Sequence, residues 1–359
     1  MKTPVLNEVH QRAGGRIGEF AGWMLPIHYG SAIRETEAVR NAAGLFDVSH
    51  MGRLEVIGEE ALPALQKLFT NDLSKLNDGG GQYTLMCNPE GGVIDDLIAF
   101  RKKADHFYLV VNASNLDKDK AWIVKNLPEK VALVDRTPET ALVALQGPNA
   151  IDILVKSGLT GATEVKRFHF LHGKLGDYDV LAMRTGYTGE NGFEIACRKE
   201  DAEAVWNLLI DNGKDMGLIP CGLASRDVLR TEAGLPLYGH EMDEKTTPAE
   251  AGLMRWVKLD KGEFFGRDNI SALVENGLPK KLAGIEMEGR DVPRPEDAVE
   301  TSAGNGTVTS GTYSPSIGKG IAMAYVPPTV QDGEQVNVLV HGKPRPGMIK
   351  KLPLYSRKK

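Results

Sequence analysis

Two adjacent acids interrupt an apolar run at residues 91–100, GGVIDDLIAF. The run predicts a strand, and successive side chains of a strand point to opposite faces. Asp95 and Asp96 therefore cannot cooperate as an acid/base pair. Because both faces are apolar, each carboxylate needs a hydrogen-bond donor or a cationic partner, or burial raises its pKa. Each acid could serve catalysis, or it could accept hydrogen bonds from a neighbouring turn.

A second candidate site lies at residues 184–198, RTGYTGENGFEIACR. Its glycines and threonines predict a tight turn that lets the backbone approach something flat or another chain closely. Glu194 then enters an apolar strand. The two acceptor oxygens of a carboxylate match the adjacent N–H groups of a heterocycle that carries an amino group. The alternative is an acid at a strand end that faces water.

A third candidate is residues 220–234, PCGLASRDVLRTEAG, which predict a helix closed by Gly234. Arg226 and Arg230 are spaced i,i+4 and share one face, whereas Asp227 diverges. Two arginines on one face could clamp a carboxylate or polarise a carbonyl. Salt bridges on the helix surface explain the same spacing equally well.

Several familiar cofactor motifs are absent from the sequence. There is no G-x-G-x-x-G after a strand, no Walker A loop, no G-x-S-x-G and no H-E-x-x-H. His169 and His172 could share a helical face as metal ligands, but their aromatic, strand-like context favours packed or surface residues. We therefore expect no metal site.

The composition is that of a globular protein, with 359 residues, 42% of them hydrophobic, and a net charge of −5. This length allows roughly two or three domains. Nucleic-acid binding is not expected, because no basic face is clustered. Three isolated cysteines indicate a reducing compartment. No apolar run approaches the roughly 20 residues of a membrane span, and the N-terminus lacks signal or transit features. We expect a cytoplasmic protein, although a mature organellar protein would look the same.

The predicted elements mix helices and strands without regular alternation, which favours an α+β fold. We expect short helices and turns over 7–50, a strand at 53–57, a helix within 59–76, three strands within 78–114, a helix at 115–127 and a strand at 140–148. A helix at 150–159, two strands within 174–198 and helices at 199–217 and 222–234 follow. After residue 280, short strands between Gly and Pro turns predict a small β-barrel, with 271–281 as linker.

Seven stretches, spaced in order along the chain, carry a family resemblance: FAGWMLPIHYGS, GLFDVSHMG, TNDL, GGVIDDLI, RTGYTGENGFE, GLASRDVLRTEAGLPLYGHEMDE and VTSGTYSPSIGKGIAMAYV. Over residues 3–355 the chain resembles the T-protein of the glycine cleavage system, a tetrahydrofolate-dependent aminomethyltransferase. The resemblance implies a three-domain cloverleaf around a central folate channel. Its folate-binding module would span 1–275, as interleaved subdomains of roughly 1–50 with 140–275 and 51–139. A C-terminal β-barrel would span 280–359.

The resemblance also implies a reaction and its partners. The methylene carbon of aminomethyl-dihydrolipoyl H-protein would pass to tetrahydrofolate, giving 5,10-methylenetetrahydrofolate and ammonia. The alternative is a tetrahydrofolate-dependent demethylase of the same fold that acts on a small methylated compound. A folate-binding scaffold of the iron–sulfur assembly type is disfavoured, because its Lys-Gly-Cys-Tyr-x-Gly-Gln-Glu signature is missing.

Site residues follow from the family's motifs position by position. The catalytic carboxylate falls on Asp96, which leaves Asp95 as a structural acid, and Arg294 is expected near the substrate arm or the folate tail. The folate-binding positions are Glu194, Arg226, Tyr83, Asn112 and Tyr187.

Two further stretches are less specific. Relatives often place a tryptophan two residues after a Gly-Leu pair; here Arg255 takes that position, or a one-residue slip brings in Trp256. We do not assign Trp256 to the folate site. The basic segment 341–359 could contact an acidic carrier protein or a folate polyglutamate, although a solvated tail is the interpretation we favour.

Overall fold

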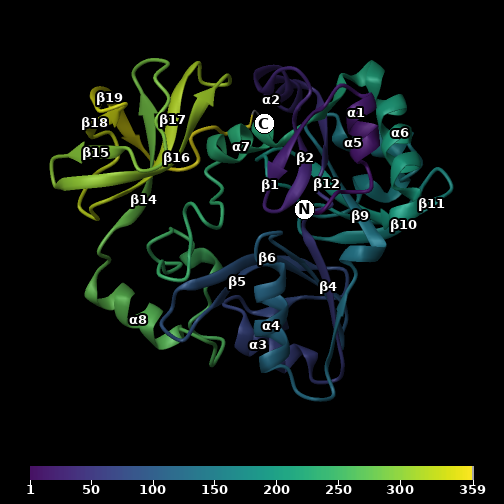
Figure 1. Cartoon of the computed structure of the whole chain (residues 1–359). Helices are drawn as coiled ribbons and strands as arrows, with labels where there is room; N and C mark the ends of the chain where they lie inside the picture. Colours follow the sequence, from purple (N-terminus) through teal and green to yellow (C-terminus); the bar gives the residue numbers. More distant parts are fainter. Residues whose placement is uncertain (358–359) are drawn as a thin grey trace. The chain divides into compact units, whose positions relative to one another are not determined.

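The computed structural model describes residues 1–357 and has the predicted α+β fold (Figure 1). Its strands form a two-stranded hairpin, a six-stranded sheet, a five-stranded sheet and a closed barrel over the described residues. The chain divides into two compact units, each described by itself. Unit 1 comprises Met1–Gln66, Asp72–Thr84 and Leu97–Arg226, and unit 2 comprises Lys67–Asn71, Leu85–Asp96 and Asp227–Lys359. The three-domain boundaries stay a prediction.

The six-stranded sheet carries Glu194 on one of its inner strands. Its order is β10 (Phe170–Leu175), β11 (Tyr178–Met183), β12 (Gly192–Arg198), β9 (Thr140–Gln146), β3 (Ala43–Asp47) and β13 (Leu218–Cys221). The helices α5 (Ala150–Lys156) and α6 (Ala202–Gly213) lie beside this sheet (Figure 1). They pack on it through buried apolar side chains such as Ile153, Val205 and Leu209. The packing of these side chains fixes the position and direction of β12.

The five-stranded sheet contains the strand with the two acids. Its order is β5 (Gly81–Cys87), β6 (Val93–Lys103), β7 (His106–Val111), β4 (Gly52–Ile57) and β8 (Ala132–Asp135), and α3 (Ala61–Leu68) and α4 (Leu116–Asn126) lie in the same part of the chain. On β6, Asp95 is fully buried and Asp96 is half-buried. The strand predicted at 91–100 and the opposite faces of its acids are confirmed.

The prediction of short helices and turns over residues 7–50 was partly wrong. The helices α1 (Asn7–Arg12) and α2 (Ala32–Asn41) are present, but β1 (Arg16–Phe20) and β2 (Trp23–His28) form an antiparallel hairpin and β3 follows α2. The hairpin turns at Ala21 and Gly22, whose φ angles of 49° and 79° are left-handed. Neither strand shows strict alternation of polar and apolar residues, so neither sequence alone predicts a strand. The hairpin depends on the pairing of the two strands with each other.

The C-terminal barrel is confirmed. Its closed order is β14 (Lys281–Met287), β17 (Lys319–Val326), β16 (Gly304–Ser314), β15 (Ala298–Thr301), β18 (Gln335–Val340) and β19 (Lys343–Lys350). Valines, alanines and isoleucines such as Val308, Ala322 and Ile285 fill the interior.

Two expectations near this barrel need correction. The predicted linker 271–281 is largely helical, because α8 (Arg267–Asn276) continues until Gly277, where a φ of 96° ends it. The basic segment is not simply a tail, because residues 343–350 form β19. Lys358 and Lys359 lie outside the described residues. Within residues 1–357, no helix is long and apolar enough to cross a membrane.

Candidate functional site

Glu194 is a buried carboxylate in the middle of a sheet. Its residue is 5% exposed, and it lies opposite Met183 on β11 and Ala144 on β9. The Thr185 hydroxyl donates a hydrogen bond of 2.6 Å to Glu194 Oε2. This contact orients the carboxylate, and its burial contradicts the alternative of an acid that faces water.

The turn before β12 is held by the protein itself. Thr188 Oγ1 donates to Gln146 Oε1 at 2.9 Å, and Gln146 Nε2 donates to the Thr185 carbonyl at 3.1 Å. Arg40 Nη1 donates to the Thr188 carbonyl at 2.7 Å. A Cβ at Gly186 would lie 1.9 Å from Gln146 Oε1, so a larger residue there would have to displace this hydrogen-bonded side chain. The turn thus packs closely on the buried Gln146 side chain, which fixes the backbone on either side of Tyr187. The predicted approach to something flat or to another chain stays a prediction.

Arg226 comes from α7 (Leu223–Glu232) and lies over the ring of Tyr187, 4.8 Å from guanidinium to ring centre. Burial lowers the pKa of Arg226, while the charges of Glu194 and Tyr187 oppose that shift. An arginine stays cationic in such surroundings. Residues Thr185, Tyr187, Glu194 and Arg226 therefore form one group, here called the Glu194–Arg226 cluster.

Glu35 on α2 fixes the start of α7. Its Oε2 accepts hydrogen bonds from the Gly222 backbone N–H at 2.8 Å and from Ser225 Oγ at 3.1 Å. Its Oε1 accepts from the Tyr29 backbone N–H at 2.6 Å. Because Glu35 binds both the Gly222 N–H before α7 and the Ser225 hydroxyl within it, the first turn of α7, which carries Arg226, has a defined position.

The other predicted folate residues lie on, or directly after, strands of the five-stranded sheet. Tyr83 is half-buried on β5, and Asn112 is half-buried directly after β7. The cluster brings together Glu194, Tyr187 and Arg226 of the predicted residues and adds Thr185, whose role the sequence did not indicate beyond turn formation. The folate-binding roles of Tyr83 and Asn112 stay predictions.

Asp96 and Asp95 differ in surroundings. Asp96 shares its strand face with Ile98 and Phe100, whereas Asp95 points to the fully buried side. The Val93 backbone N–H, at the start of this strand, donates to the carbonyls of residues 243 and 246, each at 3.0 Å. The strand end is therefore anchored in unit 2. The catalytic role of Asp96 stays a prediction.

Arg294 and the 254–256 stretch lie in unit 2. Arg294 is exposed in a turn before β15, where its backbone N–H donates to Asp297 Oδ2 at 2.7 Å. Its contact with a substrate arm or folate tail stays a prediction. Arg255 stacks over the ring of Trp256, 4.5 Å from guanidinium to ring centre, so the two residues of the family departure interact with each other.

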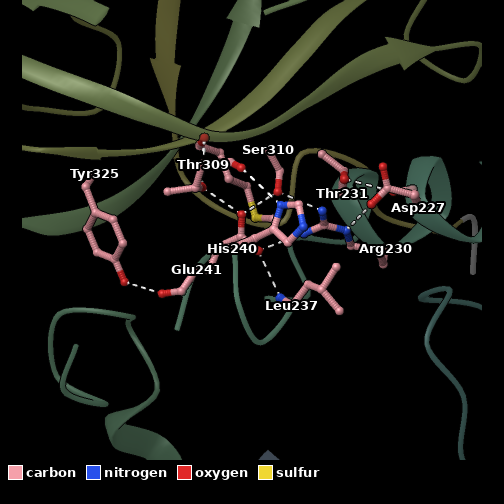
Figure 2. A network of polar contacts seen from close by, with 10 residues as sticks. Asp227, Arg230, Thr231, Leu237, His240, Glu241, Thr309, Ser310 and Tyr325 are labelled. Atoms are coloured by element: carbon pink, nitrogen blue, oxygen red, sulfur yellow. Dashed lines mark hydrogen bonds and ion pairs between the residues drawn. The ribbon is translucent and has the colours of Figure 1, made fainter. Parts of the chain in front are cut away.

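Arg230 is fully buried and, unlike Arg226, takes part in the network of polar contacts in unit 2 (Figure 2). It donates to Asp227 Oδ1 at 2.7 Å, to Glu241 Oε2 at 2.8 Å and to Ser310 Oγ at 2.7 Å. Arg230 is therefore ion-paired, as the salt-bridge interpretation predicted, but its pair with Glu241 is buried and does not lie on the helix surface. Because its partners differ from those of Arg226, the two arginines do not form a joint clamp.

Comparison with known proteins identifies the family of this chain. The model of the GCVT N-terminal domain matches residues 6–261, and that of the glycine cleavage T-protein C-terminal barrel domain matches residues 280–356. The chain belongs to the glycine cleavage T-protein family. This confirms the resemblance read from the seven motifs.

Members of the family match the chain over its whole length. An aminomethyltransferase of Caldanaerobacter subterraneus subsp. tengcongensis is 46% identical, over 99% of this chain and 96% of the relative. One from Bacillus licheniformis is 44% identical over 99% of both. The crystal structure of glycine cleavage system aminomethyltransferase T from Bartonella henselae superposes with a TM-score of 0.93 at 33% identity, covering 99% of each chain. The chain is therefore an enzyme of the aminomethyltransferase class. Within residues 1–357, no group of three or more His, Cys, Asp or Glu could hold a metal ion.

Proposed function

We propose that this enzyme transfers the methylene carbon of aminomethyl-dihydrolipoyl H-protein to tetrahydrofolate, releasing ammonia and forming 5,10-methylenetetrahydrofolate. The observation that carries the proposal is the Glu194–Arg226 cluster, in which a buried, oriented carboxylate lies near an arginine stacked on an aromatic ring. The family relationship supports the same reaction. We expect the protein to act in the cytoplasm, with lipoylated H-protein as its partner.

Glu194 suits recognition of a reduced pterin. The pterin edge carries an amino group beside a ring N–H, and an ionised carboxylate accepts from both. Burial of the carboxylate strengthens these hydrogen bonds, because little water competes. Arg226 and Tyr187 supply a cationic and a flat apolar surface for the same flat ring.

In the proposed reaction, the transferred carbon loses its bonds to the amine nitrogen and to the lipoyl sulfur. It gains bonds to two folate nitrogens, which lose their protons; the amine leaves as ammonia and the sulfur becomes a thiol. No oxidant is needed, because the carbon keeps its oxidation state. Positive charge builds on the carbon as a leaving group departs. We assign Asp96 the role of stabilising that charge as an ionised carboxylate.

The remaining predicted residues extend this assignment. Tyr83 and Asn112 are proposed to contact the folate, and Arg294 the substrate arm or the folate tail. Each carries the type of group that such a contact needs, namely a phenol, an amide and an exposed guanidinium.

A coupled assay tests the reaction. With aminomethylated H-protein and tetrahydrofolate, we expect stoichiometric ammonia and methylenetetrahydrofolate. Absence of ammonia together with turnover of a small methylated amine would favour the demethylase alternative and contradict the proposal.

A binding experiment tests the site. Glu194→Gln removes a charged acceptor and should raise the Kd for tetrahydrofolate about 10- to 100-fold. Glu55→Gln is the matched control, because Glu55 is also 5% exposed but pairs with Lys102 and Arg136. Equal Kd values for the Glu194 variant and the control would remove Glu194 from the pterin site.

A further inference from the structure

Helix α2 carries two buried charges, one near each end. Glu35 lies in its first turn and is 1% exposed, and Arg40 lies in its last turn and is 8% exposed. Each charge lies at the end of the helix where the helix dipole favours its sign. Residues five apart on a helix point about 140° away from each other, so the two side chains reach different neighbours. A buried charge is costly unless it is paired, and the partners of these two lie around the Glu194–Arg226 cluster.

Arg40 holds the turn that carries Tyr187. Its Nη1 donates to the Thr188 carbonyl at 2.7 Å and to Glu190 Oε1 at 2.8 Å. The side chains of Arg40 and Glu190 are 5% and 4% exposed, so this ion pair is shielded from water. The Glu190 backbone N–H donates to Thr188 Oγ1 at 3.2 Å. The residue that follows Tyr187 is therefore tied to the last turn of α2.

Glu35 holds the helix that carries Arg226. Its carboxylate binds the Gly222 backbone N–H and the Ser225 hydroxyl, and Ser225 directly precedes Arg226 in α7. Arg226 and Tyr187, which stack on each other, thus come from different elements. Each of them is nevertheless adjacent in sequence to a residue that binds the same short helix.

The helix α2 is itself fixed within unit 1. Val39 is fully buried and packs so closely on β3 that a Cβ at Gly44 would lie 2.4 Å from Val39 Cγ2. Directly after the last turn, the Ala42 carbonyl accepts from the Asn149 backbone N–H at 3.0 Å. A helix of ten residues that is packed in this way moves as one body, so its two buried charges keep a constant separation.

We propose that α2 is the positioning element of the Glu194–Arg226 site: through Glu35 and Arg40 it sets the separation of the Arg226 guanidinium and the Tyr187 ring, and with it the affinity for tetrahydrofolate. This inference rests on the proposed function, because it takes tetrahydrofolate as the ligand of the cluster. The guanidinium and the ring centre lie 4.8 Å apart, and side chains that are already held in place lose less conformational entropy when a ligand binds. Glu35 and Arg40 are positioning residues, which act through Arg226 and Tyr187 and do not touch the ligand.

The test is a pair of double-mutant cycles in the full chain. Arg40→Met keeps the apolar stem and removes the guanidinium, whereas Arg40→Lys keeps a charged donor. Glu35→Gln keeps the shape of the side chain and removes its charge. Arg40→Met is combined with Tyr187→Ala, and Glu35→Gln with Arg226→Ala. Titration calorimetry with 5-formyltetrahydrofolate gives each Kd, and thermal unfolding of the ligand-free chain gives each Tm.

We expect Arg40→Met and Glu35→Gln each to raise the Kd about 5- to 30-fold, and Arg40→Lys to recover part of the affinity. In the Tyr187→Ala background, Arg40→Met should change the Kd less than about twofold, because the ring that Arg40 positions is gone. Glu35→Gln should have as small an effect on the Kd once Arg226→Ala is present.

Arg101→Met is the matched control for Arg40→Met. Arg101 also donates to one carboxylate, that of Asp78 at 2.9 Å, and to one backbone carbonyl, that of Leu76 at 2.9 Å, within the same unit. Its Kd should equal that of the wild type. Glu190→Gln removes the charge of the buried partner at constant volume, so it replaces Arg40→Met in the cycle with Tyr187→Ala if Arg40→Met does not fold.

The remaining outcomes overturn the inference. A wild-type Kd in either folded single variant means that α2 does not set the affinity. An equal increase in Kd with and without the Tyr187→Ala or Arg226→Ala substitution indicates a general loss of stability, which a lower Tm would accompany. Either result leaves the proposed function intact if the wild type binds folate and Glu194→Gln weakens that binding. Absence of folate binding in the wild type refutes the proposed function, and the role of α2 with it.

Discussion

Glu241 is the centre of the polar network in unit 2, and replacing it by glutamine should destabilise that unit strongly (Figure 2). Glu241 Oε2 accepts from Arg230 Nη1 at 2.8 Å and from the Leu237 backbone N–H at 2.9 Å. Its Oε1 accepts from Thr309 and Ser310, each at 2.6 Å. Because four donors point at the carboxylate, either orientation of a glutamine amide turns its NH₂ group toward two of them.

The size of the effect follows from burial. The side chains of Arg230 and Glu241 are 1% and 0% exposed, so the substitution leaves a buried guanidinium facing a neutral amide. Breaking one half of a buried ion pair costs about 3–5 kcal/mol. The hydroxyls of Thr309 and Ser310 can rotate to accept from the amide, whereas the Arg230 and Leu237 N–H groups cannot. We therefore expect the amide oxygen to face Arg230.

Hydrogen exchange of the full chain measures this loss of stability in the strands that the network contacts. The network ends on β16 and on Tyr325 of β17, whose hydroxyl donates to the Glu241 carbonyl at 2.6 Å. Amides of these strands should exchange about 100- to 5,000-fold faster in Glu241→Gln, if exchange follows unfolding of the unit. Far-ultraviolet circular dichroism checks that the variant is folded at the start.

Asp227→Asn is the matched control, because Asp227 contacts the same guanidinium at 2.7 Å but is 51% exposed. An exposed pair contributes only about 0–1 kcal/mol, so exchange should change less than about fivefold. Glu241→Gln would refute the reasoning if it accelerated exchange no more than this control does. The buried contacts would then contribute no more than surface ones.

Three further predictions concern catalysis, pH and thiol chemistry. The Asp96→Asn variant should keep its fold and folate affinity but lose most of kcat, whereas Asp95→Asn should mainly lower Tm. A larger loss of kcat in Asp95→Asn than in Asp96→Asn would assign the catalytic role to Asp95. Burial alone would raise the pKa of Glu55, but hydrogen bonds from Lys102 and Arg136 lower this pKa to about 2. The ionised Glu55 therefore stabilises the fold fully above about pH 5, and this stabilisation disappears as the pH falls toward 2. Denaturant unfolding of Glu55→Gln should show a smaller fall over that range than the wild type. All three cysteines are buried with raised pKa values, so iodoacetamide at pH 8 should label them only after unfolding; rapid labelling of the native protein would contradict their burial.

Much of this fold could be predicted from local patterns. The barrel was visible because short apolar strands recur between Gly and Pro turns after residue 280. The strand with Asp95 and Asp96 was visible because its apolar run fits a buried strand. The hairpin of β1 and β2 was not, because its strands are short, irregular and defined by their mutual register. Pairing of this kind depends on the rest of the structure more than on strand propensity.

Arg226 and Arg230 show where reasoning about site residues from sequence must stop. Their spacing correctly places both on one face of a helix, yet a shared face does not give them shared partners. Arg230 has one local partner, Asp227, three residues away. Its buried partners are Glu241, 11 residues away, and Ser310, 80 residues away, and no local pattern could reveal these two. Arg226 instead meets the ring of Tyr187 and the charge of Glu194. Residue type and spacing thus define what a side chain can reach, and distant partners decide whether its charge is used inside the protein or is offered to a ligand.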